Sequence, residues 1–325
     1  MSGPSSASSS PNGAIGLLPA LRLLVIGFCM GLANLVPGVS GGTIAFVAGI
    51  YERLIQALKS FDREALQAVL RGDLKKLWAH IPWIFLATLG VGVVLALFSM
   101  ARVLAYLIDH HQTLLWAFFT GLILSSLLIV FRQIRPWETR HTVWLIGSAV
   151  FAILLTGAFS LQMPATAPFL FLAGMIAVCA LILPGLSGSH VLVVLGLYGT
   201  VLEAFNTLSL VSLALFGGGM AVGVLTFAQG IGWLLKHYHR STLAVLAGFM
   251  AGSLPAVWPW QRTVTTRINS SGEEVPLQQA PILPGAVEPT ELFAVLLCLA
   301  LGYGAVFLLT LLGTGKPAPL SRPAN

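Results

Sequence analysis

Two short polar stretches interrupt apolar sequence and carry side chains suited to binding an anion. The first motif reads PGVSGGT and contributes Pro37, Gly38, Ser40, Gly41, Gly42 and Thr43. The second motif reads PGLSGSH and contributes Pro184, Gly185, Ser187, Gly188, Ser189 and His190. Pro and Gly end a helix, and Ser or Thr can begin the next one. The freed N–H groups and hydroxyls favour a negative group, which glycine lets approach the backbone. The alternative is that both breaks serve tight packing alone.

Charged residues near the motifs are the next candidates. Arg22 and Arg53 would supply the countercharge that a buried anion requires. Glu52, Glu203 and His190 are candidates for coupling or gating, since charges inside a membrane usually have a function and His titrates near neutral pH. The alternative for Arg22, Arg53 and Glu203 is a charged side chain that extends from a helix end to the membrane surface.

The two motifs belong to an internal repeat. Residues 32–58 and 179–205 align without gaps, 147 positions apart, with nine of 27 residues identical. The identities include Gly49 with Gly196 and Tyr51 with Tyr198. A weaker match pairs residues 106–127 with 233–254. We therefore predict two homologous halves.

The composition identifies the setting of these motifs. The chain has 325 residues, of which 57% are hydrophobic and 9% charged, with a mean hydropathy of +0.90. Soluble domains carry about 25% charged residues, so we predict an integral membrane protein. The net charge of +6 does not indicate nucleic acid, because the basic residues lie in short loops between apolar segments. No metal site and no cofactor are predicted.

The expected fold is an all-α polytopic membrane protein built from two inverted-topology repeats. Each repeat has five apolar segments, an odd number, so the second enters the membrane upside down. The short segments beside the motifs favour a re-entrant helical hairpin plus about three spanning helices per repeat, although spanning motif helices remain open. The expected boundaries are a disordered tail at 1–14, a first repeat at 15–159, a second repeat at 160–313 and a tail at 314–325.

Charge and pattern predict the orientation and two insertions. Most Lys and Arg residues fall on one side of the membrane, which the positive-inside rule makes cytoplasmic, so both termini are expected there. A cytoplasmic amphipathic insert is predicted at 59–78, with Phe61, Leu66, Val69 and Leu70 on its apolar side. An external loop is predicted at 259–289, with a short β-hairpin inside it.

The paired PGVSGGT and PGLSGSH motifs, each followed by an apolar half-helix with Gly-x-Tyr, resemble those of a bacterial family of undecaprenyl-phosphate translocases. The resemblance extends from about Leu17 to Leu312. It implies a flippase that returns undecaprenyl phosphate from the outer to the inner leaflet of the bacterial cytoplasmic membrane, where the lipid carrier serves cell-envelope glycan synthesis. The implied ligand of both motifs is then a lipid phosphate. A homodimer is left open.

Two alternatives to this function remain. The motif is also similar to Pro-Gly-x-Ser-Arg-Ser of membrane undecaprenyl-pyrophosphate phosphatases, but Gly41 and Gly188 stand where those enzymes have arginine. A phosphatase needs a cation on the transferred phosphoryl group and a base or nucleophile. The other alternative is a channel or transporter for small anions.

Overall fold

The computed structural model describes residue 12 and residues 16–35, 40–157, 161, 163–268, 274–285 and 288–313. Pro37 and Gly38 lie outside these residues, as do the predicted tails at 1–14, apart from Asn12, and 314–325.

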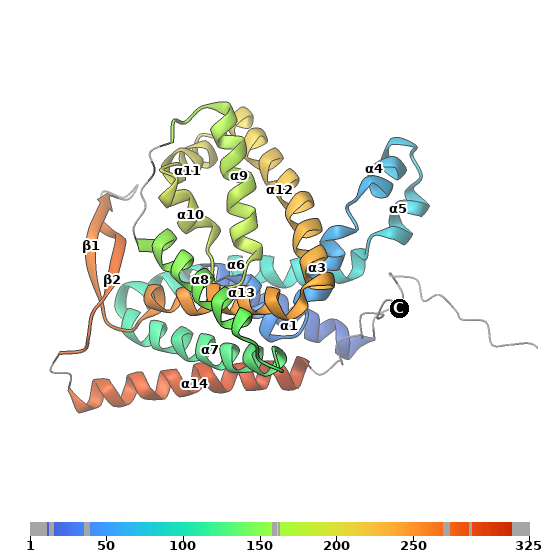
Figure 1. Ribbon diagram of the computed structural model, residues 1–325. Coiled ribbons are helices and arrows are strands. Elements are labelled where there is room, and N and C mark those ends of the chain that lie inside the picture. The colour runs from blue at the N-terminus through green and yellow to red at the C-terminus, as the bar shows by residue number, and fades with distance from the viewer. Residues whose placement is uncertain are drawn as a thin grey trace, which may run out of the picture.

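The described chain is a helical protein with one small β-hairpin (Figure 1). The elements before residue 160 are α1 (Leu17–Leu35), α2 (Gly41–Val47), α3 (Tyr51–Lys59), α4 (Arg63–Leu70), α5 (Leu74–His80), α6 (Trp83–His110), α7 (Gln112–Gln133) and α8 (Thr139–Gly157). The later elements are α9 (Ala167–Ile182), α10 (Gly188–Val194), α11 (Tyr198–Asn206), α12 (Leu210–His237), α13 (His239–Gly252), η1 (Leu254–Val257), β1 (Gln261–Ile268), β2 (Glu274–Pro281) and α14 (Pro289–Gly313).

Long apolar helices make this an all-α polytopic membrane protein. Six helices among the described residues are long and apolar enough to cross a bilayer, namely α1, α6, α7, α12, α13 with η1, and α14. Their outer faces remain apolar, as Phe98 on α6 and Phe307 on α14 show, at 88% and 64% exposure. Such surfaces are stable against lipid hydrocarbon rather than water.

The helices before and after residue 160 correspond in order and packing. α2 and α10 have seven residues each, α3 and α11 have nine, and α6 and α12 have 28. α1 packs along α6, and its counterpart α9 packs along α12. α7 packs on α14, and its counterpart α13 packs on α8. In Figure 1, α14 runs beside α7 at the bottom, and α9 to α12 stand together at the top.

Glycines permit the closest of these contacts at matching positions. A Cβ atom on Gly27 of α1 would collide with the backbone of α6, and one on Gly92 of α6 would collide with the backbone of α1. Gly174 of α9 and Gly219 of α12 have the same relation. The first members of the two pairs are 147 positions apart, like the motifs. Close backbone approach at small residues is typical of helix packing in membranes.

The chain also turns in the same way after both motif helices. Gly49, between α2 and α3, and Gly196, between α10 and α11, have φ angles of 69° and 74°. This left-handed conformation strongly favours glycine. The α10–α11 pair is bent by 115° at that turn.

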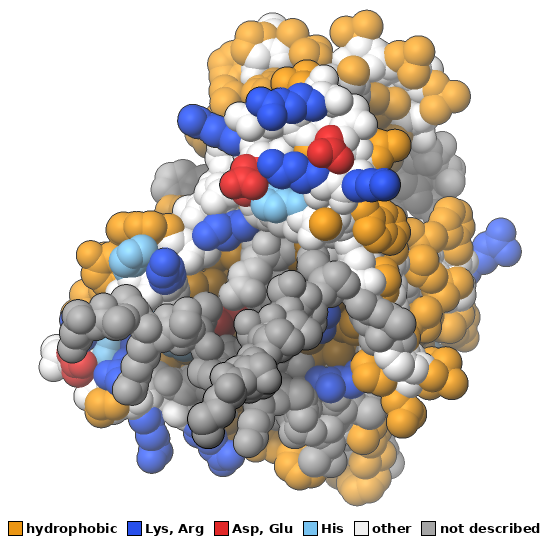
Figure 2. All heavy atoms as spheres, turned by 90° about the vertical axis from the view of Figure 1, so that its right-hand side faces the viewer, with side chains coloured by type: hydrophobic (Ala, Val, Ile, Leu, Met, Phe, Trp, Pro, Cys, Tyr) orange, Lys and Arg blue, Asp and Glu red, His pale blue; other side chains and the backbone are white. Residues whose placement is uncertain are grey.

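The insert at 59–78 differs from the single amphipathic helix that the sequence predicted. It forms two helices, α4 and α5, because Gly72 adopts a φ of 68° and Asp73 caps the second helix. Leu66, Val69 and Leu70 are exposed, whereas Phe61 packs edge-on against Trp83. Figure 2 shows Lys and Arg side chains gathered on this projecting hairpin, on the side that stands at the right in Figure 1.

The predicted hairpin in the 259–289 loop is present. β1 and β2 pair antiparallel, with Gln261 opposite Pro281 and Ile268 opposite Glu274. The predicted Ser-Ser-Gly turn lies outside the described residues.

Candidate functional site

The described part of the first motif is buried and bonded to the second half of the chain. Ser40 caps α2: its hydroxyl accepts from the Gly42 N–H at 3.1 Å and donates to the Leu181 carbonyl at 2.9 Å. The Thr43 Oγ1 accepts from the Gly185 N–H at 3.0 Å. Ser40 has 0% exposure. Its hydroxyl therefore links the two motif regions in this structure, and its proton is already donated.

The second motif is more open. Pro184, Gly185 and Gly188 are buried, whereas Ser187 and His190 are half-buried and Ser189 is exposed. The hydroxyls of Ser187 and Ser189 lie 2.9 Å apart and bond to each other. The hydrogen bond between the two serines uses only one of their two O–H groups. The other O–H group can donate a hydrogen bond to an anion.

The glycines of the two motifs have close protein neighbours. A Cβ atom on Gly42 would lie 2.4 Å from the Ile182 carbonyl oxygen, and one on Gly188 would lie 2.6 Å from the Ala177 carbonyl oxygen. The sequence predicted that these glycines leave room for a ligand. In the structure, the space beside them is filled by backbone of α9.

Arg22 and Arg53 interact electrostatically, and Arg22 lies away from the first motif. Arg53 lies within the electrostatic field of Arg22, and its guanidinium stacks 4.3 Å above the ring centre of Phe85. Within the described residues, neither arginine forms an ion pair. Arg22 lies twelve positions before Asn34, which adjoins the motif, and this spacing corresponds to about 18 Å along α1. Arg22 thus acts on Arg53 but lies about 18 Å along α1 from the first motif.

The coupling candidates lie in separate places. Glu52 on α3 accepts a hydrogen bond from, or forms an ion pair with, His239 at the start of α13, at 2.8 Å. Glu203 is exposed on α11, and His190 lies at the start of α10. The Glu52–His239 contact joins residues 187 positions apart.

The comparison that decides the family covers both motifs. Residues 30–275 match the model of a family described as undecaprenyl phosphate translocase-like. The chain belongs to this family.

Two curated relatives of this translocase-like chain carry the same name. The polyprenyl-phosphate transporter of Vibrio cholerae serotype O1 is 40% identical over 258 residues, covering 79% of this chain and 84% of the relative. The polyprenyl-phosphate transporter of Staphylococcus aureus is 33% identical over 253 residues, covering 72% and 84%. No solved structure matches the chain significantly.

The structure adds three polar residues to the candidate site of this translocase-like protein. The Asn34 Oδ1 accepts from the Gly41 N–H at 2.6 Å, so the amide occupies one donor of the first motif. The Tyr51 hydroxyl is buried with no hydrogen-bond partner among the described residues, whereas its counterpart Tyr198 borders a pocket. The identity of the two tyrosines in the aligned repeat was the sequence signal for them. Nowhere in the described chain do three His, Cys, Asp or Glu residues meet as a metal site would require.

Proposed function

We propose that the chain is a flippase that returns undecaprenyl phosphate from the outer to the inner leaflet of the bacterial cytoplasmic membrane. The observation that carries this function is the family match over residues 30–275, which includes both Pro-Gly-x-Ser-Gly motifs. The relatives from Vibrio cholerae and Staphylococcus aureus, both named polyprenyl-phosphate transporters, support a prenyl lipid as the cargo. Returning the carrier to the inner leaflet makes it available again for cell-envelope glycan synthesis.

The site favours transport over hydrolysis. At the position where the similar phosphatase motif has arginine, Gly41 and Gly188 are buried against their own protein. A side chain there would collide with neighbouring atoms before it reached a phosphate. The phosphoryl-stabilising cation of an enzyme is therefore missing from both motifs.

The proposed architecture is a pair of inverted repeats, each with a re-entrant hairpin at its motif. The matching helix lengths, the matching glycine contacts and the 115° bend between α10 and α11 support it. Hairpins that stop within the bilayer need their free backbone groups bonded inside the protein. The Ser40–Leu181 and Gly185–Thr43 hydrogen bonds between the motif regions meet this need.

The proposed orientation places both termini and the α4–α5 hairpin in the cytoplasm. The basic side chains on that hairpin and in the loop before α8 support this orientation. Arg22 and Arg53 then lie near the cytoplasmic end of the path. We assign them to the lipid phosphate as it reaches the inner leaflet, while the second motif contacts it deeper in the membrane.

The distinguishing experiment compares ligands and products for the purified chain in nanodiscs. We expect undecaprenyl phosphate to bind, and inorganic phosphate not to displace it at equal concentration. Incubation with undecaprenyl pyrophosphate should release no phosphate. Phosphate release would favour the enzyme, and displacement by inorganic phosphate would favour a small-anion transporter.

A further inference from the structure

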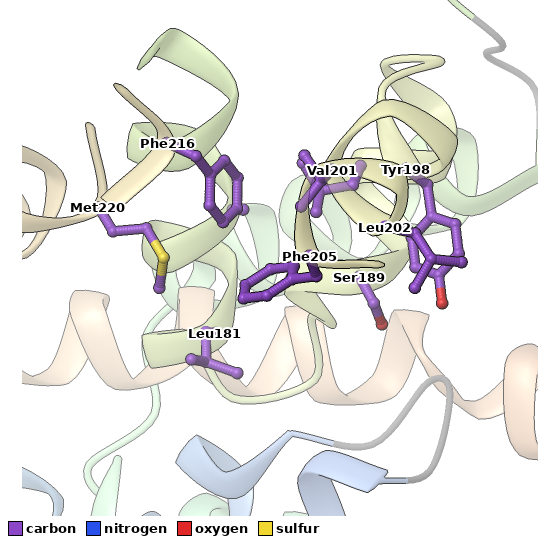
Figure 3. Close-up of a pocket in the computed structure, with 11 residues that line it drawn as sticks. Leu181, Ser189, Tyr198, Val201, Leu202, Phe205, Phe216 and Met220 are labelled. Carbon is purple, nitrogen blue, oxygen red and sulfur yellow. The ribbon is translucent and has the colours of Figure 1, made fainter. Parts of the chain in front are cut away.

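A pocket of about 310 Å³ lies between α9, α10, α11 and α12, next to the second motif (Figure 3). Phe216 and Met220 of α12 stand on one side of it and face Phe205 of α11. Ser189 and Tyr198 contribute the hydroxyl groups, and the remaining lining is apolar apart from Gly188. The pocket is thus almost wholly apolar, with two hydroxyl-bearing residues in its lining.

The pocket opens onto a surface that suits lipid. Leu202 and Phe205 line it and are themselves 40% and 56% exposed. Leu208 and Leu210, where the chain continues into α12, are 71% and 79% exposed. Because α12 is long and apolar enough to span a bilayer, we infer that these exposed apolar side chains face hydrocarbon. A prenyl chain can therefore enter from the membrane without crossing water.

The corresponding space in the first half is closed. Leu202 and Tyr198 correspond to Ile55 and Tyr51, 147 positions earlier, which are 1% and 2% exposed. Ser189 corresponds to Gly42, which is buried against Ile182. The helix break alone therefore does not create such a pocket; the open space is specific to the second motif in this structure.

We propose that this pocket binds the isoprene units nearest to the phosphate of a polyprenyl phosphate, with the phosphate directed toward the Ser187–Ser189 hydroxyl pair. The proposal rests on the proposed function and specifies where the cargo binds. The volume lies at the lower end of the roughly 300–1,000 Å³ of small-molecule sites, so only the first part of the chain fits. The remaining units extend past Leu202 and Phe205 into the bilayer.

The first test is photolabelling in nanodiscs with farnesyl phosphate that carries a diazirine on its second isoprene unit. We expect labelled peptides from residues 198–205 and 216–220, and loss of this label when undecaprenyl phosphate is added. The proposed pocket would be wrong if the label that undecaprenyl phosphate displaces were found only on other helices. If undecaprenyl phosphate displaces no label from any helix, the proposed function itself fails.

The second test fills the pocket. Leu202→Trp should weaken undecaprenyl phosphate binding at least tenfold, since the larger ring occupies the space of the prenyl chain. Leu297→Trp is the matched control, because Leu297 is exposed on α14, which contributes no residue to the pocket, and this variant should bind as wild type. Both variants are melted beside wild type to establish folding. Wild-type affinity in a folded Leu202→Trp variant would rule out the pocket while leaving the flippase function intact.

Discussion

Ser40 and Ser187 occupy equivalent positions in the two motifs but have different surroundings. Ser40 is fully buried and makes two hydrogen bonds, one of them to a residue 141 positions away, whereas Ser187 is half-buried and pairs with Ser189, which is exposed at the edge of a pocket. Stability and ligand affinity should therefore respond to different serines.

We predict that Ser40→Ala lowers the free energy of unfolding by about 1–3 kcal/mol, because it leaves the Gly42 N–H and the Leu181 carbonyl unpaired. Ser189→Ala should leave the melting temperature unchanged but weaken lipid-phosphate binding by roughly tenfold or more, the cost of one hydrogen bond to a charged group. Melting curves and binding titrations for both variants check this. The reverse assignment of the two effects would refute it.

Accessibility provides an independent check of the same difference. In a background without Cys29, Cys179 and Cys298, a small maleimide should modify Ser189→Cys rapidly and Ser40→Cys only after unfolding. Equal labelling rates in the folded protein would show that the two motifs are equally open.

For individual residues, the sequence identified the two motifs but did not predict the contacts that their side chains make. Hydroxyls and glycines at a helix break are visible as a pattern, so both motifs were predicted. The Ser40–Leu181 and Gly185–Thr43 bonds depend on how distant segments pack, which no local pattern specifies. For the same reason, the sequence analysis assigned Arg22 and Arg53 to the anion bound by the motifs. In the structure, about 18 Å of helix α1 separates Arg22 from the first motif.

Among the elements, the crossing of α1 and α6 gives the sharpest test of helix packing. Gly92 contacts the α1 backbone, whereas nothing lies within 4 Å of a Cβ atom placed on Gly90, two residues earlier. Gly92→Ala should lower the melting temperature by several degrees, because a methyl group forces the helices apart. Gly90→Ala should leave it unchanged or raise it slightly, since alanine favours a helix. Equal effects of the two substitutions would contradict the crossing.

The α4–α5 hairpin should depend on pH through Asp62. Burial alone raises the pKa of this carboxyl, but hydrogen bonds from the Ala65 N–H, His80 and the Glu64 N–H outweigh it and hold the pKa below 3.8. A lowered pKa in the folded state contributes stability that is present above 3.8 and lost as the pH falls through the folded value. Hydrogen exchange in the first turn of α4 should accordingly accelerate only in acid.

The corresponding variant tests the cap at neutral pH. Asp62→Ala should cost the α4 terminus about 1 kcal/mol and speed exchange there roughly fivefold. Glu64→Ala, a change at an exposed neighbour that accepts none of these hydrogen bonds, is the control. Similar exchange in both variants would show that Asp62 does not hold the helix.

Helix and strand boundaries agreed with the sequence prediction where turn residues clearly separated the apolar runs. The β-hairpin and the short motif helices were predicted from turn residues and apolar runs. The insert was predicted as one helix from the apolar residues Phe61, Leu66, Val69 and Leu70, all of which precede Gly72. The left-handed Gly72 and the capping Asp73 divide it, and both were readable signals.

For the whole molecule, the internal repeat predicted that helices before and after residue 160 correspond to one another. The 147-residue spacing recurs in the contacts of Gly27 and Gly174 and in the turns at Gly49 and Gly196. The difference in exposure between the halves could not be predicted, because nearly the same pattern occurs in both. It arises from packing around the motifs, which is closed beside Tyr51 and open beside Tyr198.

The paired cations give a prediction for the path of the phosphate. Arg22→Ala and Arg53→Ala should each slow transport while the protein remains folded, because an uncompensated anion in low dielectric is costly. Arg→Lys should restore transport only in part, since lysine lacks the two-pronged guanidinium contact. Initial transport rates in proteoliposomes measure this. Wild-type rates in the double alanine variant would remove both arginines from the path.

The central claim is that this chain moves undecaprenyl phosphate between leaflets. The most direct measurement uses proteoliposomes that contain undecaprenyl phosphate with a fluorophore near its phosphate end, quenched by an impermeant reductant added outside. The account predicts that quenching proceeds beyond the outer-leaflet share in vesicles with the wild-type chain, and that unlabelled undecaprenyl phosphate slows it. Quenching that stops at the same level as in protein-free vesicles would contradict the account.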